Sequence, residues 1–220
     1  MAQMPGSGVV DLLGALAYGE LTAFERMADD AKLAPTLADK AELAGLSVVE
    51  FGHFSRLRDR IAELGADVVT VMEPFRAAVD SFHAHTAPRD WIEGVVKAYV
   101  GDGIAADFYR EAAAYVDDRT REVMLEALSE TGYTEFAVTR VREAIAADPK
   151  VAGRLALWGR RLVGEALSQA QRVAAERDVL SDLLVGAGDQ QELDLASVGQ
   201  LFTRLTEEHV LRMNSLGLQS

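Results

Sequence analysis

The sequence predicts an all-α protein built on a four-helix bundle with additional short helices. Apolar residues recur at helical spacing over long stretches, and the best strand-like run, 68–72, is short and has no partner of matching pattern. Proline is rare, with 5 in 220 residues, so long helices can form without interruption. Because no linker-like segment divides the chain, we expect one domain over residues 1–220. Its bundle core should span about 8–185, and a C-terminal amphipathic helix should span about 195–214.

The first two long helices are expected at about 9–30 and 36–64. In the first, apolar residues fall at i, i+3, i+4 and i+7, which places them on one helix face. Pro35 separates the two helices, because a proline disfavours helical geometry at the residue before it. Thr36, followed three residues later by Asp39, resembles a capping box at the start of the second helix. The short connection makes the two helices antiparallel neighbours.

The rest of the chain has fewer clear boundaries. Asp148-Pro149 is a strong helix start, with Asp as N-cap and Pro at the first helical position. The expected elements are a connection at 65–88 with a helical turn at 74–82 and a loop at 83–88, a third long helix at about 89–118, two short helices at 119–128 and 133–146, a fourth long helix at 149–185 and the last helix at 195–214. The long connection leaves room for a crossover between two helix pairs.

Composition excludes several classes of function. The chain has no cysteine, so it has no thiolate zinc site, iron–sulfur cluster or cysteine nucleophile. Its 22 Lys and Arg against 35 Asp and Glu give a net charge of −13, which opposes binding to nucleic acid or to an anionic membrane surface. The sequence has no basic stretch before an apolar segment and no apolar run of about 20 residues, so we expect a cytoplasmic protein.

Charged or polar residues interrupt the apolar faces of the four long helices near their midpoints. They are Glu20 in the first helix, Glu50 and His53 in the second, Asp107 or Asp102 in the third and Glu165 in the fourth. The register of the third helix leaves the two aspartates open, and stripe position favours Asp107. In a four-helix bundle these midpoints meet at one level of the core.

A divalent metal pair would explain buried carboxylates that face one another. A buried carboxylate without a partner costs several kcal/mol or takes up a proton. Di-metal bundles solve this with one Glu from each of two helices and Glu-x-x-His from each of the other two. Glu50 and His53 have that spacing, which puts both side chains on one helix face. The predicted metal ligands are therefore Glu20, Glu50, His53, Asp107 and Glu165. The alternative is a core histidine hydrogen-bonded to a core glutamate.

The second half of this pattern is incomplete. Ser168 stands three residues after Glu165, where a second histidine is expected. The third helix offers an aspartate, which is one methylene shorter than glutamate and reaches less far across the bundle. The sequence is therefore compatible with an asymmetric di-iron site, a single-metal site or a vestigial one.

Four segments resemble a known family. They are Tyr18–Glu20, Val49–His53, Ala98–Tyr109 and Leu157–Ser168. The chain resembles the ferritin-like superfamily over about 8–185, and within it the actinobacterial proteins similar to the MiaE-like tRNA isopentenyl-adenosine hydroxylase. The resemblance implies a non-haem centre of two irons that activates dioxygen to hydroxylate an unactivated carbon. It also implies that Glu20, Glu50 and His53 are the first-half ligands and that Glu165 is the fourth-helix ligand.

Two functional interpretations follow. The first is a di-iron hydroxylase of the MiaE-like type, for which tRNA as substrate is implied by the resemblance alone. The second is a non-enzymatic ferritin-like protein that acts through protein–protein contacts, with a single-metal or vestigial core. The last helix carries an apolar side that must pack on the bundle or on a second subunit, and we expect a homodimer.

Overall fold

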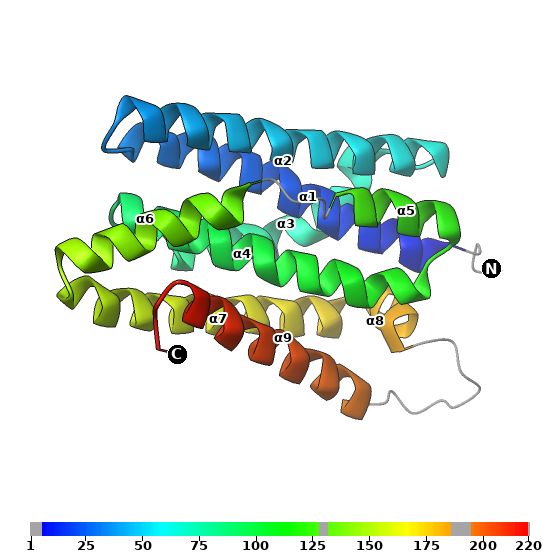
Figure 1. The fold of residues 1–220 in the computed structure, drawn as a ribbon. Helices are drawn as coiled ribbons and strands as arrows, with labels where there is room; N and C mark the ends of the chain where they lie inside the picture. Colours follow the sequence, from blue (N-terminus) through cyan, green and yellow to red (C-terminus); the bar gives the residue numbers. More distant parts are fainter. Residues whose placement is uncertain (1–5, 128–131, 186–194, 220) are drawn as a thin grey trace.

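The computed structural model describes residues 6–127, 132–185 and 195–219, and every regular element within these ranges is helical. The α-helices are α1 (Ser7–Asp30), α2 (Leu37–Glu63), α3 (Val68–His85), α4 (Trp91–Ala112), α5 (Asp118–Glu126), α6 (Tyr133–Ala147), α7 (Lys150–Glu176), α8 (Asp178–Val185) and α9 (Leu195–Ser215). In Figure 1, α2 runs along the top over α1, α4 crosses the middle, and α7 and α9 lie below it. The expected all-α bundle with short extra helices is therefore observed.

The connection expected at 65–88 is instead a full helix, so that prediction was wrong. Asp67 begins α3 by accepting a hydrogen bond from the Thr70 backbone N–H, and the helix continues through Pro74 to His85. Met72, Phe75 and Ala78 are buried at helical spacing, which identifies the face that packs into the core. The strand-like composition of 68–72 therefore reflects one apolar helix face.

Two other boundaries also differ from expectation. The segment expected as one helix at 149–185 is divided into α7 and α8 at Arg177, whose side chain reaches across to Asp11 of α1 at 2.9 Å. The third long helix ends at Ala112 and continues as a 3₁₀ turn over Ala113–Tyr115. By contrast, Thr36 caps α2 as predicted, because its hydroxyl accepts a hydrogen bond from the Asp39 N–H.

The described residues form two apolar core clusters, and polar side chains lie where α1, α2 and α4 pass from one cluster to the other. On α1, Ala17 belongs to the cluster that includes residues of α3 and α5, whereas Met27 belongs to the cluster that includes residues of α6 and α7. The same change of cluster occurs along α2 and α4. The polar residues at these changeover points are Glu20 on α1, Glu50 and His53 on α2, and Asp102 on α4. The fold therefore brings three helices to one level with a carboxylate on each.

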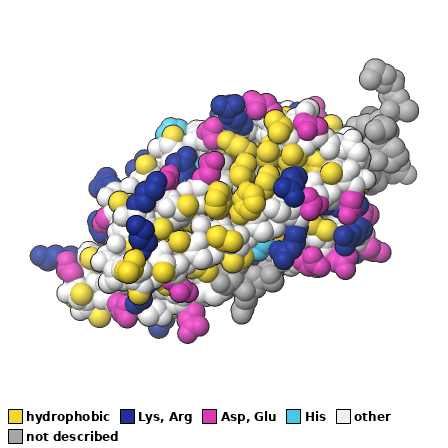
Figure 2. Space-filling view, turned by 90° about the horizontal axis from the view of Figure 1, so that it is seen from above, with side chains coloured by type: hydrophobic (Ala, Val, Ile, Leu, Met, Phe, Trp, Pro, Cys, Tyr) yellow, Lys and Arg dark blue, Asp and Glu magenta, His cyan; other side chains and the backbone are white. Residues whose placement is uncertain are grey.

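The surface over α2 carries exposed apolar side chains among its charged ones. Val48 is 65% exposed and Phe51 is 41% exposed. Seen from above, hydrophobic side chains gather in the middle of the view and charged side chains surround them (Figure 2). Among the described helices, none is both long and apolar enough to cross a membrane.

Gly14 determines how closely α1 packs on α3. A Cβ atom at this position would lie 2.3 Å from the Val71 carbonyl oxygen, so the two helices would have to separate. Gly14→Ala is expected to destabilise the protein by about 1–3 kcal/mol, measured by urea unfolding. Gly45→Ala is the matched control, because a Cβ there meets nothing within 4 Å and helix propensity should stabilise α2 by about 0.5–1 kcal/mol. Equal changes in the two variants would contradict this account.

Candidate metal centre

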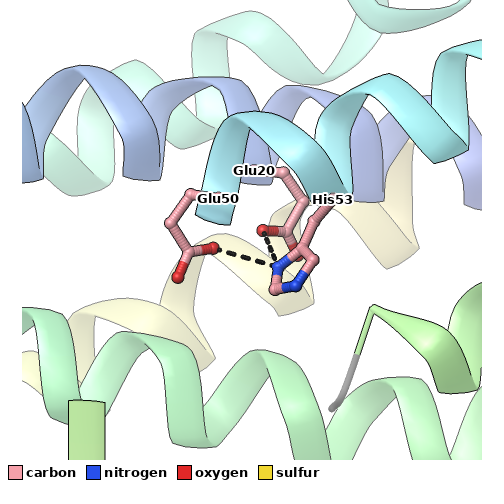
Figure 3. Close-up of side chains that lie close together, drawn as sticks. All are labelled: Glu20, Glu50 and His53. Carbon is pink, nitrogen blue, oxygen red and sulfur yellow. Dashed lines mark ion pairs between the residues drawn. The ribbon is translucent and has the colours of Figure 1, made fainter. Parts of the chain in front are cut away.

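Three buried side chains from α1 and α2 form a compact cluster. Glu20 comes from α1, and Glu50 and His53 come from successive turns of α2. His53 Nδ1 lies 3.6 Å from Glu20 Oε2 and 3.4 Å from Glu50 Oε2, and the three side chains point toward one another (Figure 3). One donor atom from each residue lies within 4.8 Å of the other two. The sequence spacing therefore does place these groups together.

The electrostatics of this cluster favour a bound cation. Burial raises the pKa of Glu50 to about 7, and the neighbouring carboxylate of Glu20 adds to the rise. Burial alone would lower the pKa of His53, but the carboxylates of Glu20 and Glu50 outweigh it and raise that pKa to about 9. Near neutral pH the cluster thus holds protons between its carboxylates, at the place where a metal ion would supply the positive charge.

Tyr109 on α4 completes the hydrogen bonding of Glu20. Its side chain is 2% exposed, and its hydroxyl donates a short hydrogen bond to Glu20 Oε1. Burial and the nearby carboxylate of Glu20 raise the pKa of Tyr109 well above its ordinary value, so the hydroxyl keeps its proton and remains a donor. Sequence reasoning did not assign this residue to the site. Tyr109 follows Asp102 by seven residues, which places both on the same face of α4. This spacing could have indicated that Tyr109 faces the site.

The two aspartates left open on the third helix have different surroundings. Asp102 lines the same cavity as Glu20 and Glu50. Burial, together with repulsion from Glu50, raises the pKa of Asp102 to about 6. Asp107 instead forms an ion pair with Arg212 of α9 and a second one, at 2.9 Å, with Arg110. The structure therefore places Asp102, and not the favoured Asp107, beside the cluster.

Glu165 also lies outside this cluster. It accepts a hydrogen bond from Gln169 at 2.9 Å and lies 2.9 Å from Nδ1 of His85 on α3. The helical spacing of apolar residues on α7 placed Glu165 on the side that faces other helices. At Glu165 the neighbouring helix is α3. Because Glu165 is not at the cluster, the serine at position 168 does not decide whether the centre is complete.

A cavity of about 240 Å³ adjoins the three-residue cluster. Glu20, Glu50, Asp102 and Tyr109 line it, together with residues further along α1, α3 and α4. A second, largely apolar cavity of about 390 Å³ lies between α3, α4, α7 and α9. The two cavities share part of their walls at Ala15, Val79, Phe82 and Phe108. The polar cluster therefore borders a cavity that adjoins a larger apolar one.

His83, which lines the smaller cavity, should make stability depend on pH. Burial lowers the pKa of His83 to about 3, whereas the unfolded chain protonates an ordinary histidine near 6.5. Between these values the unfolded state binds more protons, so the His83 contribution to stability is lost as the pH falls from about 6.5 toward 3. Compared with wild type, His83→Gln should flatten the pH dependence by up to about 1.4 kcal/mol per pH unit. Urea unfolding at pH 4, 5, 6 and 7 measures this, and parallel profiles for the two proteins would contradict it.

The donor set of the cluster fits a transition metal. Carboxylate oxygen and imidazole nitrogen suit iron, manganese and zinc, and ligand distances of about 2 Å allow three donors spaced this closely to surround one ion. His53 Nε2 is buried without a hydrogen-bond partner among the described residues, and both imidazole nitrogens are of the type that binds such metals. Asp102 is a further carboxylate on the cavity wall, available to a second ion.

Comparisons with known proteins agree with this fold. A solved structure of "Protein 19 with aldehyde deformylating oxidase activity" from Synechococcus matches with a TM-score of 0.62 and 20% sequence identity, covering 95% of this chain and 94% of that one. No curated protein matches the chain. A family model described as "Ferritin-like domain, actinomycetes" matches residues 5–187, which include Glu20, Glu50 and His53. The chain therefore belongs to the actinomycete family of ferritin-like domains.

Proposed function

We propose that this protein is an iron-dependent oxidoreductase whose metal is held by Glu20, Glu50 and His53. The observation that carries the proposal is the buried cluster itself, in which two carboxylates and an imidazole face one another beside a cavity. Unfavourable burial of this kind is typical of functional sites. The Synechococcus protein with aldehyde deformylating oxidase activity supports the assignment by analogy, since the chains share a fold.

Each residue has a distinct part in this proposal. Glu20, Glu50 and His53 supply the first metal position, and Asp102 supplies a carboxylate to a second, weaker position in place of Asp107 and Glu165. Tyr109 fixes the orientation of Glu20, because its hydroxyl donates a hydrogen bond to one of the two carboxylate oxygens. Bound iron would supply the ability to activate dioxygen. The cavity holds the organic substrate against the cluster.

The resemblance to MiaE-like proteins favours hydroxylation of an unactivated carbon as the specific reaction. The net charge of −13 opposes an intact tRNA as the substrate, because phosphate backbones are held by basic surfaces. A cavity of about 240 Å³ suits a small molecule. We therefore propose a small organic substrate rather than a nucleic acid.

Metal analysis tests this proposal. The full chain is expressed with iron supplementation, and its iron content and near-ultraviolet spectrum are measured together with oxygen consumption in the presence of a reductant. About two irons per chain with oxo-bridge absorption would support the asymmetric di-iron centre. One iron per chain with oxygen consumption would support a mononuclear oxidoreductase and remove Asp102 from the ligand set. A folded protein without metal above background would overturn the proposal.

The second candidate function is a non-enzymatic ferritin-like protein. The observation in its favour is that the charges of the three side chains already compensate one another in part, through the two ion pairs of His53 and the hydrogen bond from Tyr109. A structural polar cluster of this kind would bind no metal, and its variants would change only stability. The iron measurement therefore separates the two functions directly.

A further inference from the structure

The end of the 240 Å³ cavity away from the metal cluster contains a buried lysine. Lys97 on α4 is 6% exposed, and its Nζ donates a hydrogen bond to the Thr86 carbonyl oxygen at 2.7 Å. The same nitrogen lies 5.4 Å from the centre of the Phe82 ring. Among the described residues no carboxylate forms an ion pair with Lys97. An ammonium group has three donors, so Lys97 retains capacity for an acceptor in the cavity.

Two cationic side chains and one acidic side chain line this end of the cavity. Arg26 on α1 also lines the cavity, and it forms no ion pair within the described part of the chain. Asp30 is the carboxylate on this part of the wall, and burial raises its pKa to about 6. Burial lowers the pKa of Lys97 to about 8, so the lysine is still mostly charged at neutral pH. A buried cation, Lys97, and a surface cation, Arg26, thus lie near one acid at this end of the cavity.

A third lining group points to a missing polar partner. His83 on α3 lines the same cavity, and its Nδ1 is buried without a hydrogen-bond partner among the described residues. A buried nitrogen without a partner costs stability unless a ligand or a water molecule satisfies it. Its proximity to the two cations indicates a ligand with acceptor oxygens.

Helix geometry gives the separation between the two ends. On α4, Lys97 precedes Asp102 by five residues, which is about 7–8 Å along the helix axis. On α1, Glu20 precedes Arg26 by six residues, or about 9 Å. Apolar side chains such as Val79, which also line the cavity, can pack along the body of a ligand that spans this distance.

Cavity size limits the ligand. A protein cavity of about 150 Å³ accommodates benzene, so about 240 Å³ scales to roughly nine or ten non-hydrogen atoms. An organic acid of about seven or eight carbons, straight or aromatic, has that size. Larger acids would have to extend into the neighbouring apolar cavity past Phe82 and Phe108.

We propose that this cavity binds a small organic acid, with its carboxylate held by Lys97 and Arg26 and its apolar body directed toward Glu20 and Glu50. None of the residues that hold the carboxylate belongs to the metal cluster, so binding requires no metal. That the acid is the substrate rests on the proposed function. In that case the carbon remote from the carboxylate lies beside the metal.

Titration calorimetry on the metal-free and the iron-loaded full chain tests the proposal. Octanoate is expected to bind both forms, whereas octylamine, which has the same body and the opposite charge, should bind at least tenfold more weakly. Inorganic phosphate should also bind at least tenfold more weakly than octanoate, because it lacks the apolar body. Octanol binding as tightly as octanoate would overturn the role of the two cations, and phosphate binding as tightly would overturn the role of the apolar body.

Variants locate the bound carboxylate. Lys97→Met and Arg26→Met are each expected to raise the Kd for octanoate at least tenfold, while Arg56→Met, on the exposed side of α2, should leave it unchanged. Arg26 lies on the surface, so its variant remains informative if the loss of Lys97 unfolds the protein. Unchanged binding in the Arg26 variant, or binding that disappears when iron is removed, would overturn the proposal. Octanoate binding to a protein that takes up no iron would support it while ending the proposed oxidoreductase function.

Discussion

Glu50→Gln is expected to abolish iron binding and, at the same time, to stabilise the metal-free protein. The carboxylate is 3% exposed and faces Glu20 across His53, so the protein without metal bears the cost of burying it. Glutamine keeps the shape and the hydrogen-bonding capacity but removes the negative charge that a metal ion requires. Opposite changes in metal content and stability are typical of a ligand, because functional sites are commonly built at the expense of stability.

The pH dependence gives the sign and size of the stability change. Glu50 has a pKa of about 7 in the folded chain, against 4.5 as its ordinary value, so the folded state binds the proton more tightly. The contribution of Glu50 to the stability of the metal-free protein should therefore fall as the pH rises from about 4.5 through 7. At pH 8, Glu50→Gln should regain up to about 3 kcal/mol, whereas at pH 4 the gain should vanish.

Urea unfolding of the metal-free proteins at pH 4 and pH 8, with iron analysis after reconstitution, measures both effects. Glu42→Gln, on the exposed side of α2, is the matched control and should change neither quantity. Full iron content in Glu50→Gln would exclude Glu50 as a ligand. A loss of stability at pH 8 would show that the carboxylate has a structural role and would favour the non-enzymatic interpretation.

The sequence predicts the half of the site that lies on two consecutive helices. The short connection at Pro35 makes α1 and α2 antiparallel neighbours, so the register of Glu20 against Glu50 and His53 follows from chain length alone. The i, i+3 spacing of Glu50 and His53 then places both side chains on the face of α2 that meets α1. The structure brings these three residues together, and their role as metal ligands stays a prediction.

The other half could not be predicted, because an apolar stripe indicates that a residue is buried but not what buries it. Asp107 lies on an inward face of α4, yet its partner is Arg212, 105 residues later in the chain. Glu165 lies on an inward face of α7, and its partner is on α3, of which the sequence predicted only a helical turn at 74–82. The sequence interpretation assumed that the four long helices pack only on one another. It therefore placed Asp107 and Glu165 at the centre, whereas these two acids contact α9 and α3.

Asp107→Ala is expected to loosen α9 without changing the iron content. Asp107 and Arg212 have side chains that are each 13% exposed, and Arg212 Nη1 has no hydrogen-bond partner among the described residues. Removing the carboxylate takes away the ion-pair partner of a largely buried guanidinium and leaves Asp102 as a nearby carboxylate, which costs up to about 3 kcal/mol. Urea unfolding and limited proteolysis of α9 would report the loss.

A second ion pair across the same helix interface is the control. Glu111 and Arg204 also join α4 to α9, at 2.8 Å, but their side chains are 35% and 47% exposed. Glu111→Ala should therefore cost less than about 1 kcal/mol, because exposed pairs are screened by water. Asp102→Ala should instead reduce the iron content and loosen α9 less than Asp107→Ala does, because Asp102 attracts Arg212 without forming an ion pair with it. If Asp107→Ala instead lost iron at unchanged stability, the third-helix ligand would be Asp107 and the ion pair with Arg212 would have to open when metal binds.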